Sequence, residues 1–250
     1  MKKLLLAAAL LLCLCSCAHK GFSAYSWEYH ELDASYDRGG NEAVQEAISK
    51  YDSLIAPLQE IVCYSKAVYS KEAPESAFSN FAADALKEFA EDYSEEKIDI
   101  GLLNFGGIRT DLPKGAVRAY DMMSIFPFNN YLTVLDVEGS TLKRLFNKMA
   151  SKGKVEVLSG VRMKIDDNRL VECLVGGKPI DVSKIYKVAT IDFLVTGGDG
   201  IDWGDGILVR CDTGVLLRDA ITAVLKKRMA AGETLDLKRD GRIVITNSDK

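Results

Sequence analysis

Residues 104–109 read Asn104-Phe105-Gly106-Gly107-Ile108-Arg109, and they directly follow the apolar run 98–103. A short apolar run ahead of two consecutive glycines predicts a buried strand that ends in a sharply bent loop. The glycines let the backbone approach a ligand closely and expose main-chain N–H groups. Arg109 offers a planar fork to a phosphate or carboxylate, and Asn104 offers a donor and an acceptor to a sugar hydroxyl. The alternative is a Gly-Gly turn with a solvated arginine.

Two further loops carry side chains of complementary chemistry. Phe128 lies between Pro127 and two asparagines, so it is either a core plug or a stacking platform. Phe193 precedes the loop Gly197-Gly198-Asp199-Gly200, in which three glycines surround one carboxylate. Asp199 can accept two hydrogen bonds from a ribose diol, or it is the solvated aspartate of a hairpin turn. Taken together, the three loops predict one site with two aromatic faces for a base and polar groups for a sugar and a phosphate.

Helical and strand-like patterns alternate irregularly beyond residue 60. Apolar residues at three- and four-residue spacing predict helices over 75–93, 141–150 and 219–231. Strand patterns cover 61–63, 66–69, 98–103, 131–137, 155–161, 161–165, 170–175, 186–189 and 242–246. Gly176 and Gly177 predict a hairpin turn. This mixture indicates an α+β layered domain with mixed sheets, and not a regular βαβ winding.

The N-terminus has the pattern of an export signal. Two lysines precede an apolar run over 4–14, which is shorter than the roughly 20 residues that span a bilayer. The following Leu14-Cys15-Ser16-Cys17 resembles a bacterial lipobox, which implies cleavage before Cys17 and lipidation of that cysteine. An ordinary secretory signal or a short membrane anchor is the alternative. We therefore expect a lipid-anchored protein of the bacterial cell envelope, at the outer membrane or the periplasmic face.

The expected organisation has four parts. Residues 1–16 form a lipoprotein signal peptide, 17–40 an N-terminal arm, 41–59 a linker helix and 60–247 the folded domain. Asn41 is placed to cap the linker helix, whose apolar residues recur at helical spacing, so we expect one of its faces to be buried. The formal net charge is −4, and loss of both N-terminal lysines with the signal takes it to −6. This acidic balance argues against a nucleic-acid partner.

Cysteine and histidine usage excludes several classes of site. Cys63, Cys173 and Cys211 stand singly in strand-like runs, so we expect buried small hydrophobic residues, although one pair could oxidise. No C-x-x-C motif indicates a zinc site. The sequence has two histidines, His19 and His30, and both precede the predicted domain, which therefore lacks a Ser-His-Asp or Cys-His relay. P-loop and G-x-G-x-x-G motifs are also absent.

The three loops in combination closely resemble the C-terminal, substrate-binding domain of the 5'-nucleotidases, a family that includes UDP-sugar hydrolases and 2',3'-cyclic phosphodiesterases. The resemblance covers roughly residues 61–246. It extends to Glu75-Ser76 with Asn80 and Asp84, and to the segments 139–142, 186–190 and 240–243, while 41–58 resembles the helix that joins the family's two domains.

This resemblance implies roles for individual residues. Phe128 and Phe193 would clamp the base, Asp199 and Asn104 would hold the ribose, and Arg109 would contact the phosphate side. Gly106, Gly107 and Gly198 would complete the substrate-binding loops. The family also has arginines just before its first helix, whereas residues 70–74 contain none. Lys71 is the candidate substitute, although a lysine is a point charge without a fork.

The family's other domain hydrolyses phosphoesters with two metal ions held in D-x-H, G-N-H-E and G-H-x-H patterns. None of these patterns occurs in this sequence. The resemblance therefore implies the nucleotide- or nucleoside-binding half of a split 5'-nucleotidase in nucleotide catabolism, with no catalytic residue or cofactor of its own. The divalent metal pair is expected in a separately encoded metallophosphatase chain. The alternatives are a nucleoside-binding lipoprotein without catalysis, a stand-alone hydrolase with an unrecognised site, and a domain with a structural role alone.

Overall fold

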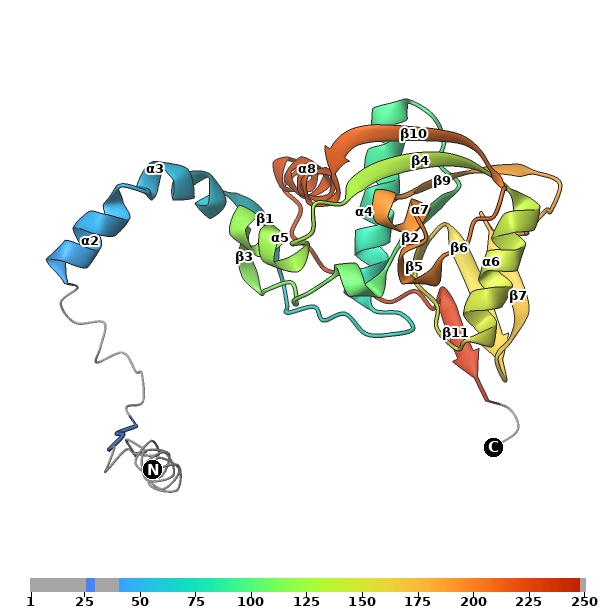
Figure 1. The fold of residues 1–250 in the computed structure, drawn as a ribbon, viewed down its shortest axis with the longest axis horizontal. Coiled ribbons are helices and arrows are strands. Elements are labelled where there is room, and N and C mark those ends of the chain that lie inside the picture. The colour runs from blue at the N-terminus through green and yellow to red at the C-terminus, as the bar shows by residue number, and fades with distance from the viewer. Residues whose placement is uncertain (1–25, 30–40, 248–250) are drawn as a thin grey trace, which may run out of the picture. The chain divides into compact units, whose positions relative to one another are not determined.

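The computed structural model describes residues 26–29 and 41–247 (Figure 1). The predicted signal peptide, the lipidation site Cys17 and the predicted arm, apart from residues 26–29, lie outside the described residues. The chain divides into two units, 1–50 and 51–250. No helix in the described part of the chain is long and apolar enough to cross a membrane.

The predicted linker helix is divided in the structure. Asn41 accepts a hydrogen bond from Ala43 N at 3.0 Å and begins α2 (Glu42–Ser49), as its capping role predicts. A separate short helix, α3 (Asp52–Ile55), runs into the 3-10 turn η2 (Ala56–Gln59). Pro57 lacks an N–H donor and restricts the residue before it, which explains why a regular α-helix does not continue there. None of these three elements has a buried side chain among the described residues, so the prediction of one buried helical face was wrong.

A five-stranded mixed sheet forms the centre of the second unit. Its strands are, in spatial order, β10 (Ile207–Leu216), β4 (Tyr131–Glu138), β9 (Ile185–Ile191), β2 (Ile100–Leu103) and β5 (Val157–Ser159). Neighbouring strands are antiparallel except for the parallel pair of β2 and β9. The combination of mixed sheets and packed helices confirms the predicted α+β domain.

Two helices pack against this sheet and against each other. The side chains of Ser76 and Ser79 form a capping box at the start of α4 (Ala77–Ser94), which packs on β2 and β5 (Figure 1). The buried stripe of α4 includes Phe78 and Leu86, as its spacing predicts. Gly101 on β2 allows close packing, because a Cβ there would lie 2.7 Å from a carbonyl oxygen of α4. The last long helix, α8 (Leu217–Ala230), packs against α4 and β1 (Ile61–Ser65).

The remaining elements extend the fold around this centre. A four-stranded sheet contains β11 (Ile243–Thr246), β6 (Val161–Asp166), β7 (Arg169–Val175) and β8 (Lys178–Pro179). The strand β3 (Gly115–Arg118) pairs with β1 and leads into α5 (Ala119–Ile125). The helix α6 (Gly139–Ser151) packs against β4 and β7. Two short helical turns, η3 (Phe105–Gly107) and α7 (Asp192–Val195), follow the ends of β2 and β9, and a third, η4 (Gly198–Gly200), follows α7.

A buried polar cluster joins the start of α4 to the closing strand. The Glu75 carboxylate is 1% exposed and accepts hydrogen bonds from Asn80 Nδ2 and from three backbone N–H groups over 240–243. Arg242 donates to both carboxylate oxygens of Asp84 at 2.8 and 2.9 Å and also to Asp240. Burial lowers the pKa of Arg242, but hydrogen bonds to Asp84 and Asp240 outweigh it and raise that pKa overall. This cluster fixes the chain end against the first helix of the domain.

Three local predictions were wrong. Residues 66–69 form no strand, because Tyr69 makes a single bridge to Leu112 within an otherwise irregular segment. The edge strand β10 was not predicted, since most of its residues are exposed and lack a clean alternation. Cys211 lies on this edge and is exposed, whereas Cys63 is buried as expected and Cys173 is intermediate. These three cysteines are free thiols.

Candidate functional site

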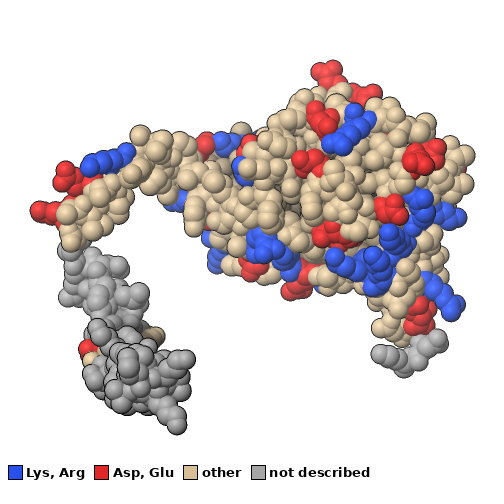
Figure 2. Space-filling model, in the orientation of Figure 1, with Lys and Arg blue, Asp and Glu red and all other residues tan. Residues whose placement is uncertain are grey.

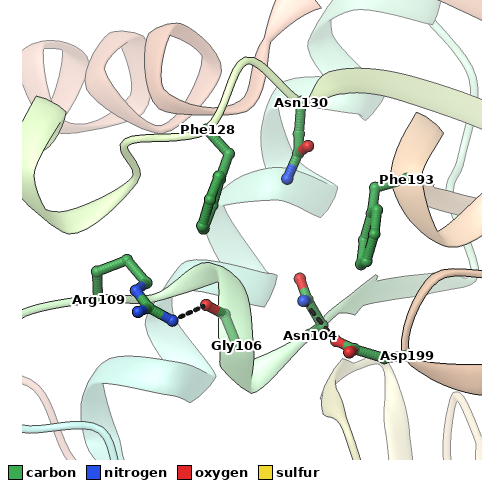
Figure 3. Close-up of a pocket in the computed structure, with 7 residues that line it drawn as sticks. All are labelled: Asn104, Gly106, Arg109, Phe128, Asn130, Phe193 and Asp199. Atoms are coloured by element: carbon green, nitrogen blue, oxygen red, sulfur yellow. Dashed lines mark hydrogen bonds between the residues drawn. The ribbon is translucent and has the colours of Figure 1, made fainter. Parts of the chain in front are cut away.

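The three glycine- and aromatic-rich loops meet around one cavity of about 260 Å³ (Figure 3). Its lining residues are Asn104, Gly106, Arg109, Phe128, Asn130, Phe193 and Asp199. These residues follow the ends of β2, α5 and β9, so segments far apart in the sequence converge because their strands are neighbours in the sheet. Six of the eight predicted site residues line the cavity, and the other two adjoin lining residues: Gly107 lies beside Asn104 and Gly198 beside the Phe193 ring.

Two phenylalanine rings face each other across the cavity. Phe128 and Phe193 are 48% and 41% exposed, and Figure 3 shows their planes roughly parallel with open space between them. A core plug would be buried, so this exposure removes the core-plug interpretation of Phe128. Two parallel aromatic faces with a gap are suited to a flat ring system that stacks on both.

The Phe128 loop is fixed by the start of α8. Arg218 donates to the Phe128 carbonyl oxygen at 3.3 Å and to Asn129 Oδ1 at 2.9 Å. The Leu217 N–H donates to the carbonyl oxygen of Asn130 at 2.9 Å. These hydrogen bonds hold the backbone that carries the Phe128 ring against the start of α8.

The Phe193 side is fixed by its own short helix. Asp192 Oδ1 accepts from the N–H groups of Phe193 at 2.8 Å and Tyr131 at 3.0 Å, which ties α7 to β4. The ring lies flat over Gly198, where a Cβ would come within 2.4 Å of it. Gly198 does not line the cavity, but any larger residue at this position would clash with the Phe193 ring.

Asn104 and Asp199 form a polar pair below the rings. Asn104 Nδ2 donates to Asp199 Oδ2 at 2.6 Å, and Asp199 adopts a left-handed backbone conformation with φ of 52°. Asn104 Oδ1 is buried and accepts no hydrogen bond within residues 26–29 and 41–247. In Figure 3 this oxygen points toward the space between the rings. A buried acceptor without a partner is costly, so it favours a ligand that donates to it.

Gly107 makes room for this asparagine. A Cβ at Gly107 would lie 2.7 Å from Asn104 Oδ1, which would force the amide out of its position. The loop itself is stabilised from behind by Lys71, whose ammonium donates to the carbonyl oxygens of Phe105, at 3.1 Å, and Ile108. Lys71 does not line the cavity, so its contacts in the structure are those of a loop support.

Arg109 lies at the opposite end of the cavity from Asp199 (Figure 3). Its guanidinium donates to the Gly106 carbonyl oxygen at 3.3 Å and stacks near the Phe128 ring, 5.8 Å from its centroid. The side chain is exposed, so its remaining N–H donors face solvent. One end of the cavity thus carries a cation and the other a carboxylate.

Asn130 is a lining residue that the sequence analysis did not select. Its amide points into the cavity between the two rings in Figure 3. The available signal is its place in the loop, because Asn130 is one of the two asparagines that directly follow Phe128. An amide at this level can donate to and accept from the edge of a stacked ring.

The donor set of the cavity does not fit a metal pair. Asp199 is the one carboxylate among the lining residues, and no histidine or cysteine joins it. Throughout the described ranges, no group of three His, Cys, Asp or Glu residues could hold a metal ion. The arrangement can therefore bind and orient a planar ligand with polar groups, and we assign no bond-breaking step to these residues.

The sequence is similar to proteins of one known family. Residues 56–205 match the family described as 5'-nucleotidase, C-terminal domain. Protein UshA of Yersinia enterocolitica is 26% identical over 133 residues, which are 52% of this chain and 24% of that relative. A 5'-nucleotidase of Vibrio cholerae is 27% identical over 108 residues, 42% of this chain and 20% of the relative. The chain thus matches only about a quarter of the length of these relatives.

Solved structures show the same fold. A 5'-nucleotidase precursor from Thermus thermophilus aligns with a TM-score of 0.68 and 24% identity over 82% of this chain and 43% of that structure. The NAD nucleotidase of Haemophilus influenzae aligns with a TM-score of 0.64 and 22% identity over 83% and 42%. The family match covers more than half of the chain and includes all three site loops. This chain belongs to the 5'-nucleotidase C-terminal domain family.

Proposed function

We propose that the cavity binds a nucleotide or nucleoside. The base stacks between Phe128 and Phe193, the ribose hydroxyls donate to Asp199 and Asn104, and Arg109 faces the phosphate. The observation that carries this proposal is the pair of half-exposed parallel rings above an amide–carboxylate pair with an unpartnered acceptor. Each part of a nucleotide then meets a group of matching chemistry: a π face, a hydroxyl acceptor and a cation.

The geometry also gives the base edge a partner. Asn130 presents an amide donor and acceptor between the rings, at the level where the edge of a stacked base would lie. An amide can serve both purines and pyrimidines, because its two groups pair with different base edges. We therefore expect stacking to dominate affinity and Asn130 to adjust the preference among bases.

The chain works, in this proposal, as the substrate-binding half of a split 5'-nucleotidase. The cavity lining lacks the donors that would hold two metal ions, and the sequence has no histidine after His30. A separately encoded metallophosphatase chain would hold the divalent metal pair, which supplies Lewis acidity and an activated water for phosphoester hydrolysis. This chain would contribute the orientation of the nucleotide, with its phosphate on the Arg109 side.

The location proposed for the protein is the bacterial cell envelope. The sequence resembles a lipoprotein precursor, in which a lipid on Cys17 would anchor the chain at the outer membrane or the periplasmic face. The arm 17–40 and the linker region 41–59 would then connect the anchor to the domain. Metabolic labelling with a fatty acid should mark the wild-type chain and leave a Cys17→Ala variant unmarked, whereas labelling of both would remove the proposal.

Co-isolation from the native membrane tests the split enzyme. The tagged lipoprotein should recover a metallophosphatase, and the two purified chains together, with Mn²⁺ or Co²⁺, should release phosphate from AMP. A Phe193→Ala variant should retain the partner but hydrolyse AMP poorly at low substrate concentration. Recovery of no metallophosphatase, together with normal AMP binding, would instead indicate a nucleoside-capturing lipoprotein without catalysis.

A further inference from the structure

A second cavity, of about 140 Å³, lies on the other side of Asp199. Its lining residues are Leu145, Lys148, Met149, Lys152, Lys154, Glu156, Asp199, Gly200 and Ile201. Asp199 lines both cavities, so its side chain and the adjoining glycine loop form the wall between them. Figure 2 shows Lys and Arg side chains gathered on this side of the domain, around α6.

Three lysines surround this cavity, and two of them are already paired. Lys154 lies 3.0 Å from Glu156, and Lys148 lies 3.6 Å from Asp202. Lys152 makes no ion pair or side-chain hydrogen bond within the part of the chain that the structure describes. Its ammonium lies over the glycine loop, 3.7 Å from where a Cβ on Gly200 would be.

The carboxylates of the cavity are also engaged. Glu156 is 3% exposed, and it accepts from the Phe105 N–H at 2.9 Å as well as from Lys154. Asp199 Oδ2 accepts from Asn104. The pKa of Lys154 is raised, first by its hydrogen bond to Glu156 and in smaller part by the charge of Asp199. Among the described residues, Lys152 is therefore the lysine of the second cavity that has no ion-pair partner, and it lies beside the wall shared with the first cavity. The Asp199 carboxylate in that wall keeps its charge, because its partner Asn104 is a neutral amide.

The orientation of the ligand follows from the proposed function, on which this inference rests. If the ribose diol donates to Asp199, then the 2' and 3' oxygens face the shared wall, and the 5' carbon points toward Arg109 at the opposite end (Figure 3). A phosphate on the 3' oxygen would extend past Asp199 toward Lys152, while the 2' hydroxyl still donates to the carboxylate.

We infer that the second cavity is a subsite for a phosphate on the ribose, so that the site accepts nucleoside 3',5'-bisphosphates. Arg109 and Lys152 are then the cations at the two ends of one ligand. The cavity of about 140 Å³ has room for a phosphate monoester. A lysine suits this place, because a flexible point charge can follow a phosphate that lies beside a carboxylate.

Calorimetry of the full chain with two ligands tests the subsite. At low salt, about 50 mM, adenosine 3',5'-bisphosphate should bind about fivefold more tightly than 5'-AMP, which is the gain expected from a partly exposed ion pair. In Lys152→Gln the ratio of the two dissociation constants should fall to about one. In the control Lys178→Gln, whose exposed lysine lies on β8, the ratio should stay near five.

The outcomes separate this inference from the proposed function. Equal affinity of the wild-type chain for both ligands, or an equal loss for both in Lys152→Gln, would overturn the subsite while leaving nucleotide binding intact. If the fivefold ratio of the two dissociation constants stayed unchanged at about 300 mM salt, this would also contradict an ion pair with the exposed Lys152, because salt screens such pairs. Failure of both ligands to bind would overturn the proposed function itself.

Discussion

Truncation of Phe193 to alanine removes one of the two stacking faces. The ring is 41% exposed without ligand and is held over Gly198 by the backbone contacts of Asp192. A base stacked on an aromatic ring contributes about 1–3 kcal/mol, so Phe193→Ala should weaken nucleoside binding by about 5- to 150-fold. The fold should tolerate the change, because a half-exposed ring contributes less than the 3–5 kcal/mol that truncation of a buried phenylalanine costs.

Isothermal titration calorimetry with adenosine, AMP and UDP-glucose measures this loss directly. Adenosine and AMP should lose a similar factor, since they share adenine and ribose and differ only in the phosphate. UDP-glucose should also lose affinity, because its uracil would stack on the same ring. Tyr120→Ala is a matched control, because Tyr120 is 57% exposed and does not line the cavity. Unchanged affinity in Phe193→Ala, or an equal loss in Tyr120→Ala, would refute the stacking argument.

Three further predictions test the support of the site and the fold. Gly198→Ala should displace the Phe193 ring and weaken adenosine binding about tenfold or more, as calorimetry of a variant with wild-type thermal stability would show. Glu75→Ala should lower the free energy of unfolding in urea by about 3–5 kcal/mol, since it leaves two buried and two partly buried donors without an acceptor, and a loss below about 1 kcal/mol would contradict this. The pKa of Asp240 is lowered, chiefly by its hydrogen bond with Arg242, so its contribution to stability is complete above a pH of about 4 and is lost as the pH falls through the lowered folded-state pKa. Asp240→Asn should therefore flatten the fall of urea stability in acid, and an unchanged slope would count against this pairing.

The loops of the site could be predicted from the sequence because their chemistry is local. Gly106 and Gly107 after an apolar run indicate a bent loop, and Phe128 among polar residues stands out from its surroundings. Their convergence required the sheet order, in which β2 and β4 both neighbour β9. The complementary chemistry of the loops and the resemblance to a family predicted one site, whereas periodicity gave no strand order.

Other features depend on long-range contacts and left no local signal. The position of Lys71 just before the first helix of the domain made it a candidate anion-binding residue. Its ammonium instead donates to two carbonyl oxygens of the glycine loop, 34 and 37 residues away. The exposed edge strand β10 lacks the alternation that identifies a half-buried strand. Residues 41–59 have helical spacing, yet the structure divides them into α2, α3 and η2, and only the change to a 3-10 turn at 56–59 coincides with Pro57.

One experiment tests the central claim most directly: titration of AMP into the purified chain, with released phosphate measured in the same sample in the presence of Mn²⁺. The structure predicts saturable binding of one AMP per chain and no phosphate release until a metallophosphatase is added. Absence of saturable binding would contradict nucleotide recognition by the cavity between Phe128 and Phe193. Release of phosphate by the chain alone would contradict the division of labour between two chains.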